Sequence, residues 1–368
     1  MKFIKFVDLK NQWNEERSKL LPLIDNVLGT GDFVGGKEIK NFEKNFAKFT
    51  NSKYCIAVGN GTDALEIAIE ALNLKKGSEV IVPANTWIST AEAVVNNGLK
   101  LVFCDINLND YTISIKDLKK KITNRTKAII AVHLYGNPAN MIEIRKIARV
   151  KKIKVIEDCA QAHGSKIKNK HVGTFGDIGT FSFFPGKNLG AFGDGGGIIT
   201  NSKSLFEYCK RASAHGSLKK YDHKFSGRNS RLDTIQAAVL SIKLENYNKS
   251  NLKRRKLAKI YFNKLKNLKK IKLFNLEKNN VSSFHQFVIR TKYRDELKNF
   301  LKKKKIDTMI HYPYMLSELK FFKYKKKINK SHNLGQCILS LPISEEHNEK
   351  EINYVCKSII DFFKRYNF

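Results

Sequence analysis

Cysteine is scarce and scattered in this sequence of 368 residues. The six cysteines show no C-x-x-C spacing, and none pairs with a nearby histidine at the spacing of metal ligands; they are Cys55, Cys104, Cys159, Cys209, Cys337 and Cys356. Most lie inside short apolar runs, which is typical of buried, reduced thiols. We therefore expect no disulfide, no zinc site and no metal in the functional site.

The sequence also lacks an apolar run of the roughly 20 residues that a membrane-spanning helix needs. Its first eight residues, MKFIKFVD, have neither the apolar core nor the small-residue cleavage site of a secretory signal. We therefore expect a cytoplasmic protein without a membrane partner. A hydrophobic content of 42% can form a large core, and the length favours one large domain with a smaller one.

Acidic residues are few, 34 against 68 basic ones, so the formal net charge is +34. Such a charge raises the question of nucleic-acid binding. The lysines are nevertheless spread along the chain, and the densest run, Lys302 to Lys305, falls in a pattern typical of a solvated helix face. Because no RNA- or DNA-binding motif is present, we expect no specific nucleic-acid partner. The positive field would still favour encounters with an anionic substrate such as a diphosphate.

Strand and helix patterns alternate through the first 250 residues. Strand-like apolar runs occur at 54–58, 79–83, 101–105, 128–133, 155–156 and 180–184. Helical patterns occur at 13–28, 37–49, 61–72, 114–121, 141–150 and 235–244. This alternation predicts an α/β fold with a mainly parallel sheet and helices on both faces. Beyond Lys249 come lysine-rich helices (252–268, 295–304) and a strand (284–289), so we predict a large domain, 1–248, and a small one, 249–368.

Two polar side chains follow neighbouring predicted strands. Val155-Ile156 leads to Glu157-Asp158, and the strand at 180–184 leads to Pro185-Gly186-Lys187 and then a glycine-rich stretch. A carboxylate and an amine at adjacent strand ends suit a pyridoxal phosphate enzyme, in which the acid keeps the ring nitrogen protonated and the lysine forms the Schiff base. Taken alone, Asp158 reads more simply as the N-cap of a helix starting at Cys159, and Lys187 as a solvated lysine. The glycines favour positive φ angles and close approach of a ligand to the backbone.

Two other segments can complete such a site. Small residues at 59–63 connect a strand to a helix, where free N–H groups suit a phosphate. The alternative is a simple turn in which Thr62 or Asp63 caps the helix; the lysine of a nucleotide P-loop is missing. Trp87 follows the strand at 79–83, and it is either a core residue or a flat surface in the crevice at the strand ends.

Taken together, these motifs resemble the DegT/DnrJ/EryC1/StrS family of sugar aminotransferases along nearly the whole chain. The matching segments are FVDL (6–9), GNGTDAL (59–65), PANTW (83–87), HLYG (133–136), EDCAQAHG (157–164), FSFFPGKN (181–188), GRNSRLD (227–233) and LP (341–342). The resemblance implies the aspartate aminotransferase fold (PLP fold type I), with a mixed, mainly parallel sheet in the large domain and a smaller C-terminal α+β domain.

The family resemblance also implies roles for individual residues. It implies pyridoxal 5'-phosphate bound to Lys187 as an internal aldimine, with Asp158 at the ring nitrogen. The other implied cofactor contacts are Gly61, Thr62, Trp87, Gln161, Ser182 and Asn229, the last reaching the neighbouring subunit's cofactor in a homodimer with shared active sites. The implied substrate contacts are His163, Tyr221, Arg231, His311 and Tyr312. For three of these residues an alternative stays open: a purely structural role for His163 and His311, and pairing with a structural acid for Arg231.

The sequence AQAHG (160–164) resembles the family group that aminates C3 of dTDP-3-keto-6-deoxyhexoses with L-glutamate as donor, and His163 is the distinguishing residue. The resemblance thus implies amino-sugar biosynthesis for a surface glycan such as lipopolysaccharide or for a glycosylated product. The alternative is a C4 aminotransferase acting on a nucleotide-linked 4-keto-6-deoxy sugar. Lys187 disfavours a sugar dehydratase of this family, in which histidine replaces the lysine. The joint presence of Asp158, Ser182, Lys187 and Asn229 disfavours a noncatalytic regulatory relative.

Overall fold

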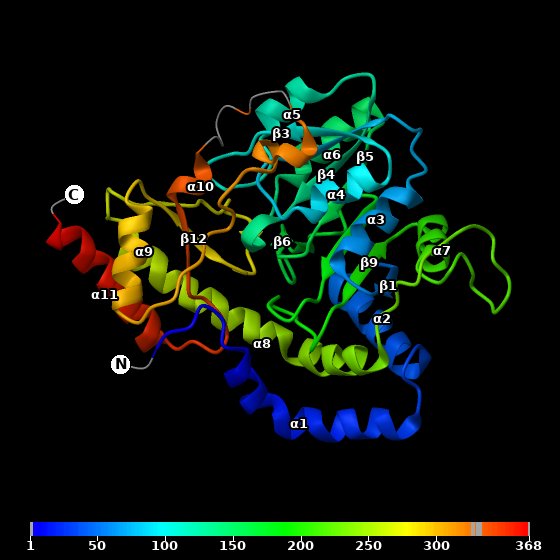
Figure 1. The fold of residues 1–368 in the computed structure, drawn as a ribbon, viewed down its shortest axis with the longest axis horizontal. Helices are drawn as coiled ribbons and strands as arrows, with labels where there is room; N and C mark the ends of the chain where they lie inside the picture. The colour runs from blue at the N-terminus through cyan, green and yellow to red at the C-terminus, as the bar shows by residue number, and fades with distance from the viewer. Residues whose placement is uncertain (1–2, 325–327, 329–332, 367–368) are drawn as a thin grey trace.

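A seven-stranded sheet lies at the centre of the computed structural model, which describes residues 3–324, 328 and 333–366 (Figure 1). Its strand order is β1-β9-β8-β5-β4-β2-β3. The strands are β1 (Tyr54–Val58), β2 (Glu79–Pro83), β3 (Lys100–Cys104), β4 (Thr126–Val132), β5 (Lys154–Asp158), β8 (Ile178–Ser182) and β9 (Gly196–Thr200). All neighbours pair in parallel except β9, which is antiparallel to β1 and β8. The predicted mainly parallel sheet is therefore confirmed.

Helices cover both faces of this sheet because successive strand residues point to opposite sides. Cys55 and Ala57 of β1 belong to a core that includes residues of α2 (Gly36–Thr50) and α6 (Met141–Lys151). Ile56 and Val58 belong to the opposite core, which includes residues of α3 (Gly61–Ala71), α4 (Ser89–Asn96) and α7 (Lys203–Ala212). Of the remaining helices, α5 (Ile115–Lys121) contacts β3, whereas α1 (Leu9–Thr30) lies away from the sheet and packs along α8 (Thr234–Leu265) (Figure 1).

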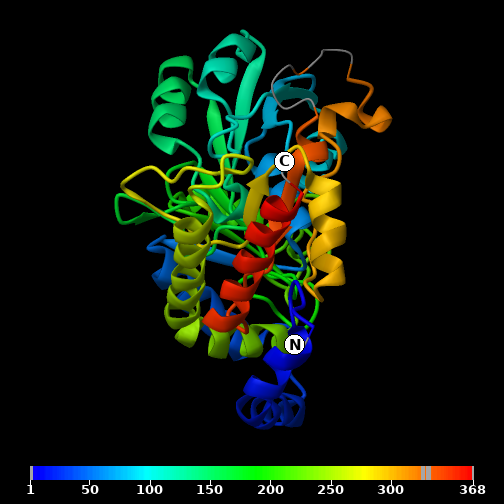
Figure 2. The ribbon, with the colours of Figure 1, turned by 90° about the vertical axis from the view of Figure 1, so that its left-hand side faces the viewer.

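The C-terminal part packs around a third core and a three-stranded sheet of order β10-β12-β13 (Figure 2). Its elements are β10 (Lys272–Leu273), β12 (Phe287–Arg290), α9 (Arg294–Lys303), α10 (Leu334–Cys337), β13 (Ile338–Leu341) and α11 (Glu349–Arg365). A second small sheet joins β11 (Asn280–Val281) to β6 (Lys166–Ile167) and β7 (Lys170–His171). The C-terminal part therefore pairs with a loop of the large one.

A single helix, α8 (Thr234–Leu265), replaces the two helices predicted at 235–244 and 252–268. Ala237 and Leu240 pack in a core under the large sheet, whereas Leu257 and Tyr261 pack in the C-terminal core. The polar stretch between these groups contains neither proline nor glycine, so nothing interrupts the helix. The proposed boundary at 248/249 therefore falls inside a continuous helix, and the N-terminal segment bridges to the C-terminal part through Ile4 and Ile306.

The six cysteines are free thiols, as predicted, and all are buried except the half-buried Cys337. Burial raises the pKa of the Cys104 and Cys159 thiols above its ordinary value, so both stay protonated. Among the helices of the described residues, none has an apolar stretch sufficient to cross a membrane.

Candidate active site

Asp158 ends β5 in the middle of the large sheet, and its side chain is buried. Its Oδ2 accepts a hydrogen bond from Thr90 Oγ1 at 2.9 Å, and its Oδ1 accepts one from the Ala160 N–H at 3.1 Å. Burial raises the pKa of Asp158, while these two bonds and the attraction of Lys187 oppose the rise. Turns and not a helix follow Asp158, so the interpretation as a helix N-cap is wrong.

Lys187 lies in the loop after β8, the neighbour of β5 in the sheet. The residue is half-buried, and its Nζ makes no hydrogen bond or ion pair with any described residue. Burial lowers the pKa of the Lys187 amine to about 8, and the attraction of Asp158 opposes this shift. About a tenth of the amine is therefore neutral at pH 7, far more than for an ordinary lysine, and the neutral form is the one that attacks a carbonyl carbon.

Three histidines come close enough to Lys187 for its charge to act on them. Burial and the Lys187 charge lower the pKa of His163 to about 3 and that of His311 to about 4. The same two causes lower the pKa of His285, which was not identified from the sequence and whose Nδ1 lies 2.9 Å from Asn188 Oδ1. All three imidazoles are therefore neutral near pH 7, so they add no positive charge around the amine.

A set of hydroxyl groups gathers at the N-terminus of α3. Asn60 caps this helix by accepting the Asp63 N–H at 2.8 Å, so neither Thr62 nor Asp63 is the cap. The Thr62 and Ser89 hydroxyl oxygens are 2.8 Å apart. Ser182, at the end of β8, lies directly against Gly61. Hydroxyls at the positive end of a helix suit a phosphate group. Ser89 was missed because its position at the start of α4 carries no motif of its own.

Gly61 is essential to this arrangement because a Cβ at this position would lie 2.7 Å from Ser182 Cβ. Gly61→Ala should therefore push β8 away from α3 and weaken cofactor binding by about 10-fold or more, since it displaces the phosphate-binding groups. Titration of the apoenzyme with pyridoxal phosphate, followed by absorbance, measures this loss. Gly29→Ala in α1 is the control, because no atom lies within 4 Å of its added Cβ; equal affinities of the two variants would contradict the prediction.

The glycines after Lys187 pack the chain against itself. None of Gly190, Gly193, Gly195, Gly196 and Gly197 has φ in the left-handed region, so the expectation of positive φ is wrong. The last two of them lie in β9. A Cβ on Gly196 would lie 2.2 Å from the Asn60 carbonyl oxygen. The glycine therefore allows close contact between strand β9 and the turn at Asn60, not between the backbone and a ligand.

Trp87 and Tyr312 approach each other from distant parts of the chain. Trp87 follows β2 and is 57% exposed, so it is not a core residue. The two ring centroids are 5.7 Å apart at an angle of 45°. Gln161 donates from Nε2 to the Tyr312 hydroxyl at 3.0 Å. The structure therefore brings three of the predicted site residues together.

His163 lies apart from solvent. Its ring is fully buried, 5.4 Å from the Phe181 ring and 5.7 Å from the Phe183 ring. Neither ring nitrogen has a hydrogen-bond partner among the described residues. The ring offers no exposed surface in this conformation, so substrate contact by His163 stays a prediction that needs a local rearrangement.

The other predicted substrate and cofactor contacts lie at the surface of the subunit. Tyr221 is 81% exposed in the loop that projects between α7 and α8 (Figure 1). Asn229 and Arg231 are exposed and joined by a 2.9 Å hydrogen bond from Arg231 Nε to Asn229 Oδ1. Their segment is anchored beside α3, because Ser230 Oγ accepts the Gly59 N–H at 3.0 Å. His311 is half-buried, with Nδ1 2.9 Å from Ser340 Oγ.

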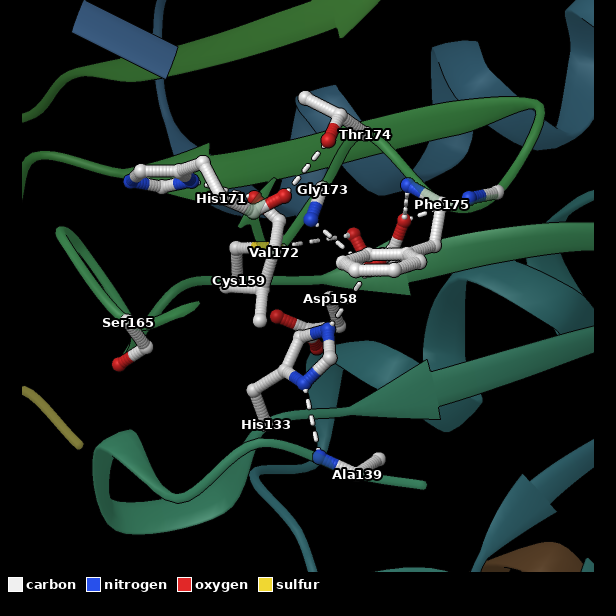
Figure 3. Close-up of polar contacts among 12 residues, drawn as sticks. His133, Ala139, Asp158, Cys159, Ser165, His171, Val172, Gly173, Thr174 and Phe175 are labelled. Carbon is white, nitrogen blue, oxygen red and sulfur yellow. Dashed lines mark hydrogen bonds and ion pairs between the residues drawn. The ribbon is translucent and has the colours of Figure 1, made fainter. Parts of the chain in front are cut away.

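A buried cluster at the carboxyl ends of β4 and β5, formed by His133 and Glu157, supports this site from the interior. Figure 3 shows His133 and Ala139 on one side of it, and Gly173 and Phe175 on the other. The Glu157 carboxylate accepts hydrogen bonds from the N–H groups of Gly173 (2.8 Å), Phe175 (2.7 Å) and Gly176 (2.6 Å), and lies 3.0 Å from His133 Nε2.

Cys159, His133 and Glu157 hold potential ligand atoms within 4.8 Å of one another. His133 Nδ1 accepts the Ala139 N–H at 3.0 Å, so the ring proton sits on Nε2 and points to Glu157. Both ring positions and the carboxylate are thus occupied by hydrogen bonds. This donor set does not favour a metal ion, because the ligand lone pairs are already used.

Glu157→Gln should destabilise the fold by about 3 kcal/mol, since an amide cannot accept all four bonds in a buried position. Burial raises the pKa of Glu157, but His133 and the N–H groups outweigh it and lower the pKa overall. The stability that the ionised Glu157 contributes is therefore fully present above the ordinary glutamate pKa of 4.5, and it disappears as pH falls through the lowered pKa of the folded state. Urea unfolding at pH 7 measures the effect. Glu207→Gln, at a carboxylate whose side chain is 47% exposed, is the control, and equal urea midpoints for the two variants would contradict the prediction.

Comparisons with known proteins agree with this arrangement. Residues 14–360 match the model of the DegT/DnrJ/EryC1/StrS aminotransferase family. A dTDP-3-amino-3,6-dideoxy-alpha-D-galactopyranose transaminase of Aneurinibacillus thermoaerophilus is 40% identical, covering 97% of this chain and 98% of the relative. A "pleiotropic regulatory protein" of Geobacillus stearothermophilus is 38% identical over 99% of both chains. The crystal structure of S. venezuelae DesV with a ketimine intermediate has a TM-score of 0.95 at 35% identity, covering 98% and 99%.

The relatives differ in their nucleotides. A UDP-N-acetyl-3-dehydro-alpha-D-glucosamine 3-aminotransferase of Acidithiobacillus ferrooxidans is 38% identical over 95% of both chains. A GDP-perosamine synthase of Escherichia coli O157:H7 is 36% identical over 89% of this chain and 91% of the relative. The match to the family model and these identities over nearly the full length lead to one conclusion: the chain belongs to the DegT/DnrJ/EryC1/StrS aminotransferase family.

Proposed function

We propose that this protein is a pyridoxal phosphate-dependent aminotransferase that transfers an amino group to a nucleotide-linked keto sugar. The observation that carries this conclusion is the placement of the Asp158 carboxylate, at the end of β5, and the Lys187 amine, in the loop after the neighbouring strand β8, close enough for their charges to interact. Membership of an aminotransferase family supports it. Purified protein should be yellow, with an absorbance that shifts when glutamate is added. A colourless protein that pyridoxal phosphate does not convert would exclude this function.

The residues present fit pyridoxal phosphate. A Cβ at Gly61 would lie 2.7 Å from Ser182 Cβ, so the glycine lets Ser182 pack against the start of α3, where hydroxyl groups and free N–H groups suit a phosphate. The unpartnered amine of Lys187 is available for the aldehyde, and the buried Asp158 suits a protonated ring nitrogen. The exposed ring of Trp87 provides a flat surface for the pyridine ring. When bound, the group supplies an electron sink for the bond that breaks at Cα of the amino acid.

Asp158 has the role of holding the proton on the ring nitrogen. Its two oxygens are fixed by Thr90 and Ala160, so the carboxylate keeps one orientation. Bonds to these two donors favour the ionised form against the effect of burial. A charged carboxylate in a buried place interacts strongly with a protonated ring nitrogen, because little water screens the pair.

Lys187 has the role of moving a proton. Its Nζ would take the proton from Cα of the amino donor and would deliver a proton to the carbon that the cofactor's aldehyde supplies. The pKa of about 8 suits this task, because the amine exchanges protons readily near neutral pH. His163 and His311 are neutral near this pH, so they add no charge that would change the protonation of Lys187.

The proposed reaction moves the amine of L-glutamate to C3 of a dTDP-3-keto-6-deoxyhexose. Similarity to a dTDP-3-amino-sugar transaminase supports this choice. A C4 aminotransferase is the alternative, and relatives named for UDP and GDP sugars keep the nucleotide open. The test is to incubate the enzyme and glutamate with dTDP-, UDP- and GDP-linked 3-keto and 4-keto sugars and to locate the new C–N bond by NMR. Amination at C4 alone would overturn the C3 proposal.

The active unit is proposed to be a homodimer that shares its sites. The exposure of Tyr221, Asn229 and Arg231 supports this, because exposed side chains are available to contact a second subunit; Asn229 is the residue that we expect to reach the partner's cofactor. Mixing Lys187→Ala subunits with Asn229→Ala subunits tests the proposal. Mixed dimers would then contain one intact site and recover part of the activity, whereas no recovery in verified mixed dimers would exclude shared sites.

A further inference from the structure

A short turn after β4 carries a residue with a backbone conformation that is rare outside glycine. Tyr135, in the 3-10 turn η1 (Leu134–Gly136), has φ 61° and ψ 11° and is buried. In this conformation its main-chain N–H donates to Gln161 Oε1 at 2.7 Å. A left-handed tyrosine costs about 1 kcal/mol or more and persists only where its surroundings hold it.

The side chain of Tyr135 extends the contact to the C-terminal part. Its hydroxyl donates to the His311 carbonyl oxygen, and Asn85 Nδ2 lies 3.4 Å from the same hydroxyl. Gln161 in turn donates to the Tyr312 hydroxyl at 3.0 Å. His311 and Tyr312 are adjacent in the chain, so these bonds close into a cycle. We call this cycle the hydrogen-bond ring; its members are Tyr135, Gln161, Tyr312 and His311.

The hydrogen-bond ring determines which way the Gln161 amide points. The main-chain N–H of Tyr135 requires the carbonyl oxygen of the amide, so the NH₂ group must lie on the other side. One of its hydrogens is used by Tyr312, and the other is left to donate. Tyr312 accepts from Gln161, which leaves its own hydroxyl hydrogen free to donate.

We propose that Tyr135 is a positioning residue for the sugar substrate: it holds the segment 311–312 against Gln161 and so fixes the Tyr312 ring beside Trp87. This inference rests on the proposed function, in which the space next to Trp87 receives the cofactor and the sugar. Tyr135 acts through other residues, because it is buried and its N–H, carbonyl and hydroxyl groups are all engaged with the protein.

The test is a double-mutant cycle in the holoenzyme with Tyr135→Phe and Tyr312→Phe. Each change removes one bond of the hydrogen-bond ring. Each single variant should therefore lower kcat/KM for the keto sugar on the order of 10-fold, mainly by raising KM. The double variant should be little worse than either single variant, because the ring is already open. Strictly additive losses, or an unchanged Tyr135→Phe enzyme, would overturn the proposal.

Tyr111→Phe is the matched control. Tyr111 is also buried, its ring lies 5.6 Å from that of Tyr135, and its hydroxyl bonds to no described residue. It should keep the wild-type kcat/KM. A loss equal to that of Tyr135→Phe would show that removing any buried hydroxyl in this core has the same effect, which would contradict a positioning role.

Amide hydrogen exchange separates failure of this inference from failure of the proposed function. Opening the ring should speed exchange at residues 309–315 in Tyr135→Phe but not in Tyr111→Phe. If the wild-type enzyme aminates no keto sugar, the proposed function fails. Unchanged exchange at residues 309–315 in Tyr135→Phe would, independently, contradict the positioning role of the hydrogen-bond ring. Should Tyr135→Phe not fold, Gln161→Met and Tyr312→Phe break the same ring from its other side, and additive effects in that pair would overturn it.

Discussion

Lys187→Ala should abolish transamination, with a loss of kcat on the order of 10⁴-fold or more, because one side chain provides both the covalent attachment and the proton transfer. The fold should tolerate the change. Nζ makes no hydrogen bond or ion pair with a described residue, and burial disfavours its charge, so its removal leaves no partner unsatisfied. Thermal unfolding should therefore show a melting temperature at or above that of the wild type.

The measurement is the rate of amine transfer from glutamate, with Lys203→Ala as the control for an exposed lysine.

The rate at which the wild-type apoenzyme captures pyridoxal phosphate should depend on pH. Only the neutral amine attacks the aldehyde, so the capture rate should rise with pH around a midpoint of about 8. A midpoint near the ordinary 10.5, or turnover retained by Lys187→Ala, would contradict the assigned role.

Local patterns were sufficient to predict the strands that carry the site. The runs at 54–58 and 79–83 coincide with β1 and β2, because each is a short apolar segment bounded by polar or turn residues. Asp158 and Lys187 were identified for the same reason, since a polar residue at the end of an apolar strand is a local feature. The glycine-rich strand β9 was missed, because Gly196-Gly197 gives no apolar signal until packing against β1 is known.

The residues that support the site depend on contacts between distant segments. Thr90 reaches Asp158 from α4, and Glu157 binds amides eighteen residues away at Phe175. The left-handed Tyr135 has no signature in its neighbours either, because tyrosine rarely takes that conformation. Sequence patterns reveal which groups end a strand, but the partners of those groups follow from the three-dimensional arrangement of the sheet.

Asp158→Asn should lower kcat by about 10²- to 10⁴-fold while leaving the fold and cofactor binding nearly intact. The amide has the same shape, and its oxygen can still accept from Ala160 or Thr90. What is lost is the negative charge that keeps the ring nitrogen protonated, and with it the electron sink.

A cofactor analogue methylated at the ring nitrogen provides the decisive control for Asp158→Asn. Its ring is permanently positive, so a carboxylate is no longer needed to hold a proton there, and the analogue should restore part of the activity of Asp158→Asn. Thr90→Val, which keeps the carboxylate but removes one of its donors, should lose less than about 10-fold, because a single hydrogen bond contributes about 1 kcal/mol. If the analogue fails to improve the variant, or if Thr90→Val is as impaired as Asp158→Asn, Asp158 acts by orienting its neighbours, not through its charge.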